Sequence, residues 1–255
     1  MGENKKIFVL GDIHGAYKAL LQCLERSNFN KEEDTLIQLG DICDGWSEVY
    51  ECVEELLTIK NLIAIKGNHD DWFNSWIRMS VHPTKWLQGG EGTLKSYCNN
   101  LDKEFVTINN GYMTNMIVED LPISHIEFFR KQHKYYKDNF GRLFVHGGFN
   151  RHDLLIDQQY DYIFWWDRDL WYQALSAGGL GQKLRIKEPV EEIFIGHTAT
   201  TSWKKDTPMR ASIVYNLDTG AGFGAGKLTI MDINSKKIWQ SDPVNSLYPE
   251  EKGRN

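Results

Sequence analysis

The stretch Ile7-Phe8-Val9-Leu10-Gly11-Asp12-Ile13-His14-Gly15 decides the fold, because a short apolar run ends at a glycine and is followed by polar residues. A continuous run of four apolar residues is typical of a strand buried on both faces. The following segment, 16–27, places leucines at helical spacing, and 35–39 is again apolar before Gly40. The opening of the chain therefore predicts a strand, a helix and a second strand.

The same order then repeats. Residues 49–57 carry apolar side chains on one helical face, and Leu62-Ile63-Ala64-Ile65 forms another apolar run before Gly67. Strands that alternate with helices in this way indicate a parallel sheet with right-handed crossovers. We therefore expect an α/β fold that begins βαβαβ.

The pattern changes between about residues 71 and 140, where the sequence is rich in aromatic residues and mostly of helical pattern, with no clear buried strand. We interpret this segment as a helical insertion. Further strands are predicted at 142–145, 193–195, 212–216, 227–233 and 236–240, the last two as a hairpin that turns at Asn234-Ser235. With 255 residues and no linker, the chain is expected to form a single domain.

Composition excludes several classes of function. The net charge is −6, and basic residues occur at most in adjacent pairs, so no nucleic-acid footprint is expected. The apolar run near the start is too short for a signal peptide or a membrane span, so no membrane partner is expected. The four cysteines show no CxxC spacing and are interpreted as reduced thiols of a cytoplasmic protein. The sequence carries no signal for an oligomeric state.

Each of the first three strands ends in a glycine followed by polar residues: GDIHG at 11–15, GDICDG at 40–45 and GNHD at 67–70. Two later strands end in the same way, with HGG at 146–148 and GHT at 196–198. The carboxyl ends of parallel strands lie side by side, where open α/β sheets place their sites. Asp, Asn and His there supply oxygen and imidazole ligands, so the sequence predicts a divalent-metal site.

Single residues of these types carry less weight. An aspartate after a strand is often a helix cap, and a lone histidine is more often structural than a ligand. The structural interpretation is kept for four histidines: His82, His125, His133 and His152. The five motifs in fixed order are what favour a metal centre.

These motifs resemble those of the calcineurin-like metallophosphoesterases, and within them the phosphoprotein phosphatases with their bacterial and phage relatives. Two closing segments, NLDTG at 216–220 and GKLT at 226–229, are also similar to the family pattern. The resemblance covers roughly residues 6 to 233. It implies a two-sheet β-sandwich flanked by helices.

The resemblance also implies a ligand set for two divalent cations. Asp12 and His14 would bind one metal, Asp41 would bridge, and the second metal would be bound by three further residues, Asn68, His146 and His197. Two such cations lower the pKa of a bridging water and stabilise the attacking and leaving oxygens at phosphorus. Ligation without cysteine suits manganese, iron or zinc, of which manganese is favoured here.

Two residues are predicted to handle the proton. The resemblance implies that His69, next to Asn68, is the general acid that protonates the leaving oxygen. Asp44 would orient the His69 imidazole and stabilise its charged form.

The chain departs from the family pattern at two positions. Gly45 stands where protein phosphatases carry an arginine that binds phosphate, and Asp70 replaces the usual glutamate. Arg168, in a WWDR segment similar to one that contacts phosphate in the family, is the best remaining cation, and Asn68 would also contact the phosphate. The alternative for Arg168 is a surface residue paired with Asp167 or Asp169.

The expected activity is hydrolysis of phosphomonoesters, including phosphorylated side chains of proteins, by a metal-dependent phosphatase. Two alternatives stay open: a dinucleoside polyphosphate hydrolase of the diadenosine tetraphosphatase type, and an inactive scaffold that binds a partner.

The Gly-rich stretch 89–92 is interpreted as a turn before a helix, because it lacks a GK[ST] ending. The aromatic clusters at 72–76 and 164–166 are interpreted as core.

Overall fold

The structure, a computed structural model, describes residues 5–79, 86–108 and 111–254. Its first part is the predicted βαβαβ unit, in the order β1 (Ile7–Leu10), α1 (Tyr17–Ser27), β2 (Thr35–Gln38), α2 (Val49–Leu57) and β3 (Asn61–Ala64). The three strands pair in parallel, with Val9 opposite Ile37. This confirms the sequence prediction and brings the three polar strand ends to one edge.

Two later strands complete the first sheet. β11 (Thr229–Asp232) pairs antiparallel with β1, and β12 (Ile238–Gln240) pairs antiparallel with β11, so the order is β12-β11-β1-β2-β3. The carboxylate of Asp232 accepts the main-chain N–H groups of Asn234 and Ser235, each at 2.9 Å. The predicted hairpin turn is therefore closed by a side chain of its own first strand.

The second sheet has a parallel centre and antiparallel edges. Its order is β6 (Tyr135–Lys137), β7 (Arg142–Val145), β8 (Glu192–Ile195), β10 (Val214–Asn216) and β9 (Met209–Ala211). The three central strands were predicted, whereas the edge strands β6 and β9 were not. Each edge strand has only three residues, which is too short to show a periodic pattern.

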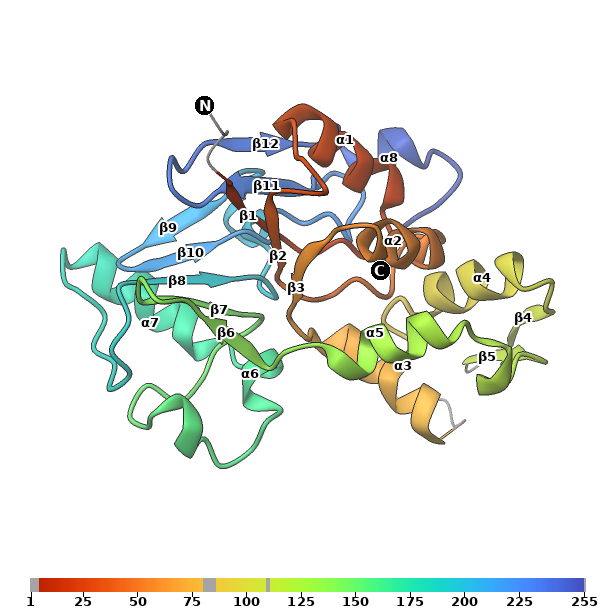
Figure 1. Ribbon diagram of the computed structural model, residues 1–255, viewed down its shortest axis with the longest axis horizontal. Coiled ribbons are helices and arrows are strands. Elements are labelled where there is room, and N and C mark those ends of the chain that lie inside the picture. Colours follow the sequence, from red (N-terminus) through yellow and green to blue (C-terminus); the bar gives the residue numbers. More distant parts are fainter. Residues whose placement is uncertain (1–4, 80–85, 109–110, 255) are drawn as a thin grey trace.

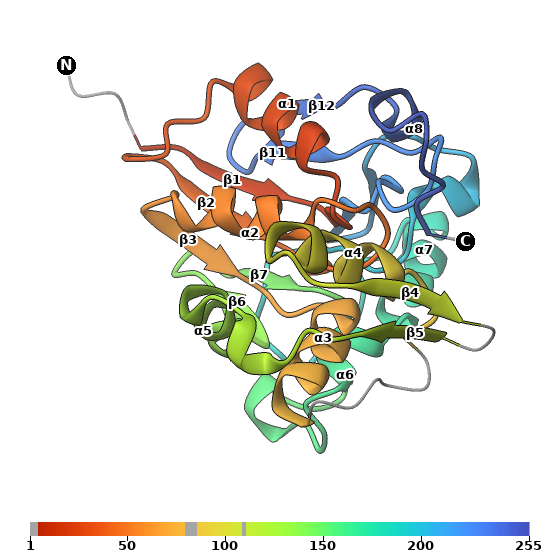
Figure 2. The same ribbon diagram turned by 90° about the vertical axis from the view of Figure 1, so that its right-hand side faces the viewer.

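The two sheets pack face to face, as Figures 1 and 2 show. Val9 and Ile37 from the first sheet meet Phe144 and Phe194 from the second in one buried cluster. On the outer faces, α1 packs on β11 and β12, and α7 (Asp169–Gly179) packs on β9 and β10. This is the expected two-sheet sandwich flanked by helices.

The segment expected to be a helical insertion is mainly helical but also contains strands. It holds α3 (Asn68–Met79), α4 (Gly90–Asn100), the hairpin β4 (Phe105–Ile108) and β5 (Gly111–Thr114), the 3₁₀ turn η1 (Val118–Asp120) and α5 (Ile123–Lys131), before β6. The hairpin was missed because Val106 and Met113 are exposed, which leaves no buried apolar run. Figure 1 shows these helices and the hairpin beside the first sheet.

The remaining short helical elements are η2 (Leu155–Asp157), α6 (Ile163–Trp166), η3 (Thr200–Trp203) and α8 (Val244–Leu247). Most of the predicted aromatic core is buried, including Trp72, Phe73 and Phe164, but Trp166 is 39% exposed. Among the helices that the structure describes, none has the length and apolar character that crossing a bilayer requires.

Candidate metal and catalytic site

The polar residues predicted at the strand ends converge on one buried site. They follow β1, β2, β7 and β8 or begin α3, and none is more than 7% exposed: Asp12, His14, Asp41, Asp44, Asn68, His69, His146 and His197. Burial of so many ionisable groups costs stability unless they are paired or bind metal. Part of this cost is offset by pairs of Asp and His within the site, such as Asp44 with His69 and Asp41 with His146.

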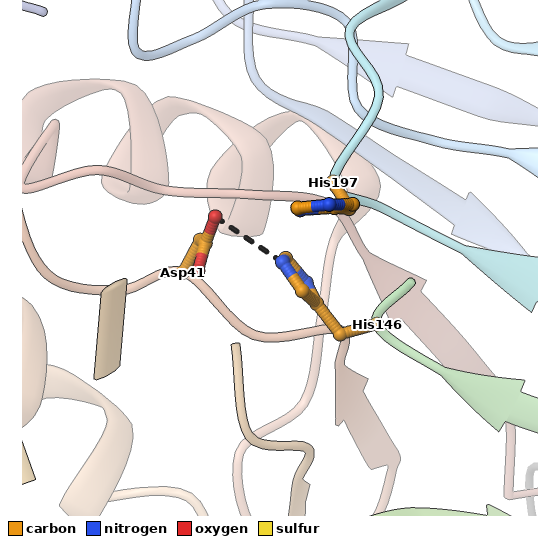
Figure 3. A group of neighbouring side chains, drawn as sticks. All are labelled: Asp41, His146 and His197. Atoms are coloured by element: carbon orange, nitrogen blue, oxygen red, sulfur yellow. Dashed lines mark ion pairs between the residues drawn. The ribbon is translucent and has the colours of Figure 1, made fainter. Parts of the chain in front are cut away.

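Asp41 belongs to two groups of donor atoms. Asp12, His14 and Asp41 form one group, and Asp41, His146 and His197 form the other, with the donor atoms of each within 4.8 Å of one another. Figure 3 shows the members of the second group pointing toward one another from separate segments, with the Asp41 carboxylate 3.2 Å from His146 Nε2. Asn68 Oδ1 lies 3.2 Å from the same nitrogen.

Hydrogen bonds fix the ring nitrogens of two histidines. His146 Nδ1 lies 2.8 Å from the Leu39 carbonyl, and His14 Nδ1 lies 2.9 Å from the Cys43 carbonyl. Because a carbonyl oxygen only accepts, each Nδ1 carries a proton, and each Nε2 is the nitrogen that a bound cation would meet. This is the tautomer that a metal-binding imidazole requires.

Two buried atoms test whether the donors fit a cation. Across the described ranges, Asp12 Oδ1 and His197 Nε2 are buried side-chain atoms without a hydrogen-bond partner. The other Asp12 oxygen accepts the His197 main-chain N–H at 3.0 Å, so both residues are already positioned. Unpaired buried donors and acceptors are costly, and a bound cation would satisfy both.

The local charge also favours a cation. Burial alone lowers the pKa of His146, but the neighbouring Asp41 carboxylate outweighs this effect and raises the pKa to about 9. The site thus stabilises positive charge even on a fully buried imidazole.

The backbone of the site needs special residues. A Cβ built at Gly67 would lie 2.1 Å from Asp41 Oδ1, and one at Gly196 would lie 2.1 Å from Asp12 Oδ1. His14 and Asp41 themselves have positive φ angles, which non-glycine residues rarely adopt. The glycines in the motifs therefore make room for the carboxylates, and the strain lies at the site itself.

His69 and Asp44 form the predicted pair. His69 Nδ1 lies 2.7 Å from Asp44 Oδ2, while Asp44 Oδ1 accepts hydrogen bonds from Trp86 Nε1 at 2.8 Å and Thr93 Oγ1 at 2.6 Å. Burial raises the pKa of Asp44 to about 7 and lowers the pKa of His69 to about 3. Burial thus disfavours the charged form of both members of the pair, which are coupled through the 2.7 Å contact.

Asp70 has a role that the sequence analysis did not assign. Its carboxylate accepts the main-chain N–H groups of Asp41, Ile42 and Cys43 at 2.9–3.1 Å. Asp70 also accepts a hydrogen bond from Gln132 Nε2 at 2.8 Å. The signal was present in the GNHD motif, but the pairing with the 41–43 loop exists only in three dimensions.

Arg168 is exposed, but among the described residues it forms an ion pair with neither Asp167 nor Asp169, the partners of the alternative interpretation. Its Nη1 donates to the His197 carbonyl at 2.8 Å and to Thr198 Oγ1 at 2.9 Å, whereas Asp167 pairs with Arg151 at 3.1 Å. Arg168 lines a hollow of about 490 Å³ together with His197. It therefore lies beside the metal-ligand candidates.

Gly45 has φ +114°, a conformation that an arginine there would adopt only under strain. The backbone conformation at residue 45 therefore favours glycine over any residue with a side chain.

Three of the histidines interpreted as structural are described, and none of the three belongs to the groups of metal-binding donors. His125 is buried between Tyr97 Oη at 2.8 Å and Glu54 Oε1 at 2.6 Å, and His133 and His152 are exposed. His82 lies outside the described residues.

Two curated proteins are similar to part of this chain. Serine/threonine-protein phosphatase 1 of Salmonella typhimurium is 31% identical over 86 residues, which cover 34% of this chain and 39% of that protein. The symmetrical bis(5'-nucleosyl)-tetraphosphatase of Buchnera aphidicola is 36% identical over 64 residues, or 25% of this chain and 23% of that protein. The chain thus aligns with well under half the length of these curated relatives.

The fold extends over a much larger part of the chain. The cold-active protein-tyrosine phosphatase of a Shewanella species matches with a TM-score of 0.54 and 15% identity, over 93% of this chain and 80% of that one. The family profile of the calcineurin-like phosphoesterases matches residues 5–219. The chain therefore belongs to the calcineurin-like phosphoesterase family.

Proposed function

We propose that the protein is a metal-dependent phosphatase that hydrolyses phosphate monoesters, with phosphorylated protein side chains as the favoured substrates. The observation that carries the proposal is the position of Asp41, whose carboxylate is shared by two groups of metal-binding donors beside the His69–Asp44 pair. Two adjacent cations can stabilise the attacking and leaving oxygens of an in-line displacement at phosphorus, and a proton donor can protonate the leaving oxygen.

The proposed ligands divide between two cations. Asp12 and His14 would hold one, Asp41 would contact both, and three residues would hold the other: Asn68, His146 and His197. Bound cations of this kind activate water and neutralise charge on the phosphoryl oxygens. Manganese is our choice among the metals that suit oxygen and imidazole donors.

The remaining residues position the substrate and the proton. His69 holds the proton that the leaving oxygen needs, and Asp44 orients the imidazole through the 2.7 Å contact. Arg168 would bind phosphate oxygens, because its Nη1 is anchored to the main-chain carbonyl of the candidate ligand His197. Asn68, whose Oδ1 lies 3.2 Å from His146 Nε2, would contact them from within the ligand cluster. An arginine guanidinium has five N–H donors, so Nη1 can anchor to the His197 loop while others bind phosphate.

A second candidate is hydrolysis of a dinucleoside polyphosphate. Tyr172 and Phe223, which are 50% and 38% exposed, line the same hollow as Arg168 and offer ring faces on which a base could stack. The same faces would also accept the ring of a phosphotyrosine. An inactive scaffold is the third candidate, but it would have no need of a buried His69–Asp44 pair aligned with metal donors.

A substrate panel with added Mn²⁺ tests these candidates. It compares an aryl phosphate, phosphoserine, phosphothreonine and phosphotyrosine peptides, and diadenosine tetraphosphate, with Asp41→Asn as the control for contaminating phosphatase. We expect turnover of the monoesters by the wild type alone. Exclusive turnover of diadenosine tetraphosphate would favour the second candidate, and no turnover of any substrate would favour the scaffold.

The proposed compartment is the cytoplasm. In the described chain, Cys23, Cys43, Cys52 and Cys98 are all free and buried, which supports a protein that keeps its thiols reduced.

A further inference from the structure

Arg254 places its side chain in the candidate active site from a segment far along the chain. Its Nη1 lies 2.9 Å from His14 Nε2. Because His14 Nδ1 is the protonated nitrogen, Nε2 accepts this hydrogen bond from the guanidinium. Arg254 also lines the hollow that Arg168 and His197 line, so two arginines from separate segments face one space.

The stem of Arg254 occupies space that two glycines leave open. A Cβ built at Gly45 would lie 3.4 Å from Arg254 Cγ, and one at Gly89 would lie 2.9 Å from the same atom. The two glycines are joined by a hydrogen bond from Gly45 N to the Gly89 carbonyl, at 2.9 Å. The methylene groups of Arg254 therefore lie against the position at which a side chain of residue 45 would begin.

The segment that carries Arg254, residues 244–254, is fastened at several points. Arg254 N donates to the Gly222 carbonyl at 2.8 Å, and Gly253 forms an antiparallel bridge with Phe223. Earlier in the segment, the Glu251 carboxylate accepts two hydrogen bonds from Ser47, at 3.0 Å and 2.8 Å. These contacts therefore hold the main chain that carries the Arg254 side chain.

Tyr248 adds a further attachment by stacking on Trp46 at 5.1 Å between ring centroids. Trp46 in turn donates from Nε1 to the Ala221 carbonyl at 2.7 Å. The 244–254 segment and the loop at 221–223 are thus joined to the residues that directly follow Gly45. This arrangement fixes the base of the Arg254 side chain.

The polar atoms of Arg254 are only partly satisfied by the protein. Its Nε is buried and, over the residues that the structure covers, has no hydrogen-bond partner. The Phe223 ring lies 5.2 Å from the guanidinium carbon and covers one side of it. Asp218, which lines the same hollow, supplies negative charge, but its Oδ1 accepts the Gly220 N–H at 3.0 Å.

We propose that Arg254 binds the substrate phosphate and takes the place of the phosphate-binding side chain that Gly45 lacks. The inference rests on the proposed phosphatase function. A guanidinium that lies beside the candidate ligand His14, is partly desolvated and lines one hollow with a second arginine suits a phosphate dianion better than solvent-exposed lysines do. Arg254 would give up its hydrogen bond to His14 Nε2 when that nitrogen binds a cation.

The test measures binding of inorganic phosphate to the metal-loaded protein by titration calorimetry, which does not depend on turnover. Arg254→Met should weaken phosphate binding by about ten- to a hundredfold, the range expected for losing charge-assisted hydrogen bonds. Arg254→Lys keeps the charge but loses the planar fork, so its phosphate affinity should lie between those of the wild type and Arg254→Met. Lys252→Met is the matched control, because it removes an exposed charge from the same segment and should bind phosphate as the wild type does.

The outcomes separate this inference from the proposed function. Phosphate affinity of Arg254→Met equal to that of wild type, with wild-type turnover intact, would overturn the role of Arg254 alone. Tighter phosphate binding in Arg254→Met would also overturn it, because the arginine would then block the site. A metal-loaded wild type that neither binds phosphate nor hydrolyses an aryl phosphate would contradict the function itself. Metal content and thermal unfolding of each variant confirm that it is folded and loaded.

Discussion

The carboxylate of Asp70 accepts the main-chain N–H of Asp41 at 3.0 Å, so the residue shared by both donor groups is positioned by a carboxylate that belongs to neither group. The same side chain binds the next two N–H groups of the loop. The positive φ of Asp41 is thus maintained by the first turn of α3. The GNHD motif therefore contributes to the site twice, through Asn68 and through the support that Asp70 gives to Asp41.

Asp70→Asn should weaken metal binding although Asp70 is not a proposed ligand. An asparagine offers one acceptor oxygen in place of two, so at least one N–H of the 41–43 loop loses its partner. We expect metal affinity to fall by about 10- to 100-fold, the range for residues that orient ligands. Competition with a chelator measures this change. Asp71→Asn is the control, because Asp71 lies on the same helical turn and, among the described residues, has Lys66 at 3.6 Å as its ion-pair partner. Equal effects of the two substitutions would argue against the special role of Asp70.

Asp41→Asn should reduce metal content more than Asp12→Asn does. Asp41 Oδ2 lies 3.2 Å from His146 Nε2 and 3.7 Å from His14 Nε2, so loss of its charge affects both donor groups. Metal per chain, determined by elemental analysis after dialysis, should drop toward zero in Asp41→Asn and toward one in Asp12→Asn. If both variants bound the same amount of metal, the proposed role of Asp41 as the ligand shared by both cations would be contradicted.

His69→Asn should impair poor leaving groups selectively. General acid catalysis contributes typically about 10²–10⁴-fold where the leaving group needs a proton. We expect kcat for an alkyl phosphate to fall by about that factor, and kcat for nitrophenyl phosphate to fall much less. Equal losses on the two substrates would indicate that the 2.7 Å contact between His69 and Asp44 serves the structure alone.

Arg168→Ala should raise the inhibition constant of inorganic phosphate by about tenfold or more, because a charge-assisted hydrogen bond is lost. Metal content is measured on the same sample, since Arg168 also bonds to the His197 carbonyl. Thr198→Val removes the other anchor of Nη1 while keeping the charge, and it should change the constant less. An unchanged constant in Arg168→Ala would exclude this residue from phosphate binding.

His125 should make the fold sensitive to mild acid. Burial lowers the pKa of His125, against the opposing effect of Glu54, so the unfolded chain binds a proton that the folded chain does not. The free energy of unfolding therefore falls as the pH drops below about 6.5, the ordinary pKa of histidine. In His125→Gln this dependence should be shallower than in the wild type between pH 7 and pH 5, as measured by urea unfolding. Parallel pH profiles of the two proteins would refute the assignment.

The sequence predicted the features that depend on local pattern. Apolar runs that end in Gly-Asp or Gly-Asn placed β1, β2 and β3, and the parallel pairing followed from the helices between them. The confirmed sandwich came from the family resemblance, because nothing in the periodicity of the chain shows which strands form the second sheet. The edge strand Met209–Ala211 was too short to predict.

Other features depend on contacts between distant segments. The contact of Arg254 with His14 and the bonds of Asp70 to the 41–43 loop have no local signature, since each joins segments that only the fold brings together. The predicted ligands, by contrast, each follow a strand, and a parallel sheet brings strand ends together by its geometry. Their roles as metal ligands stay predictions that the substitutions above test.

The position of β1 between β2 and β11 has a consequence for synthesis on the ribosome. β1 and β2 emerge early, but β11, Thr229–Asp232, leaves the ribosome only after nearly all the proposed site residues have been made. Until then one edge of β1 has unpaired N–H and C=O groups, which are a template for pairing with other chains. A nascent chain that stalls before Thr229 therefore carries nearly every residue of the site and still lacks a closed first sheet. We expect such chains to depend on chaperones and to aggregate when released early.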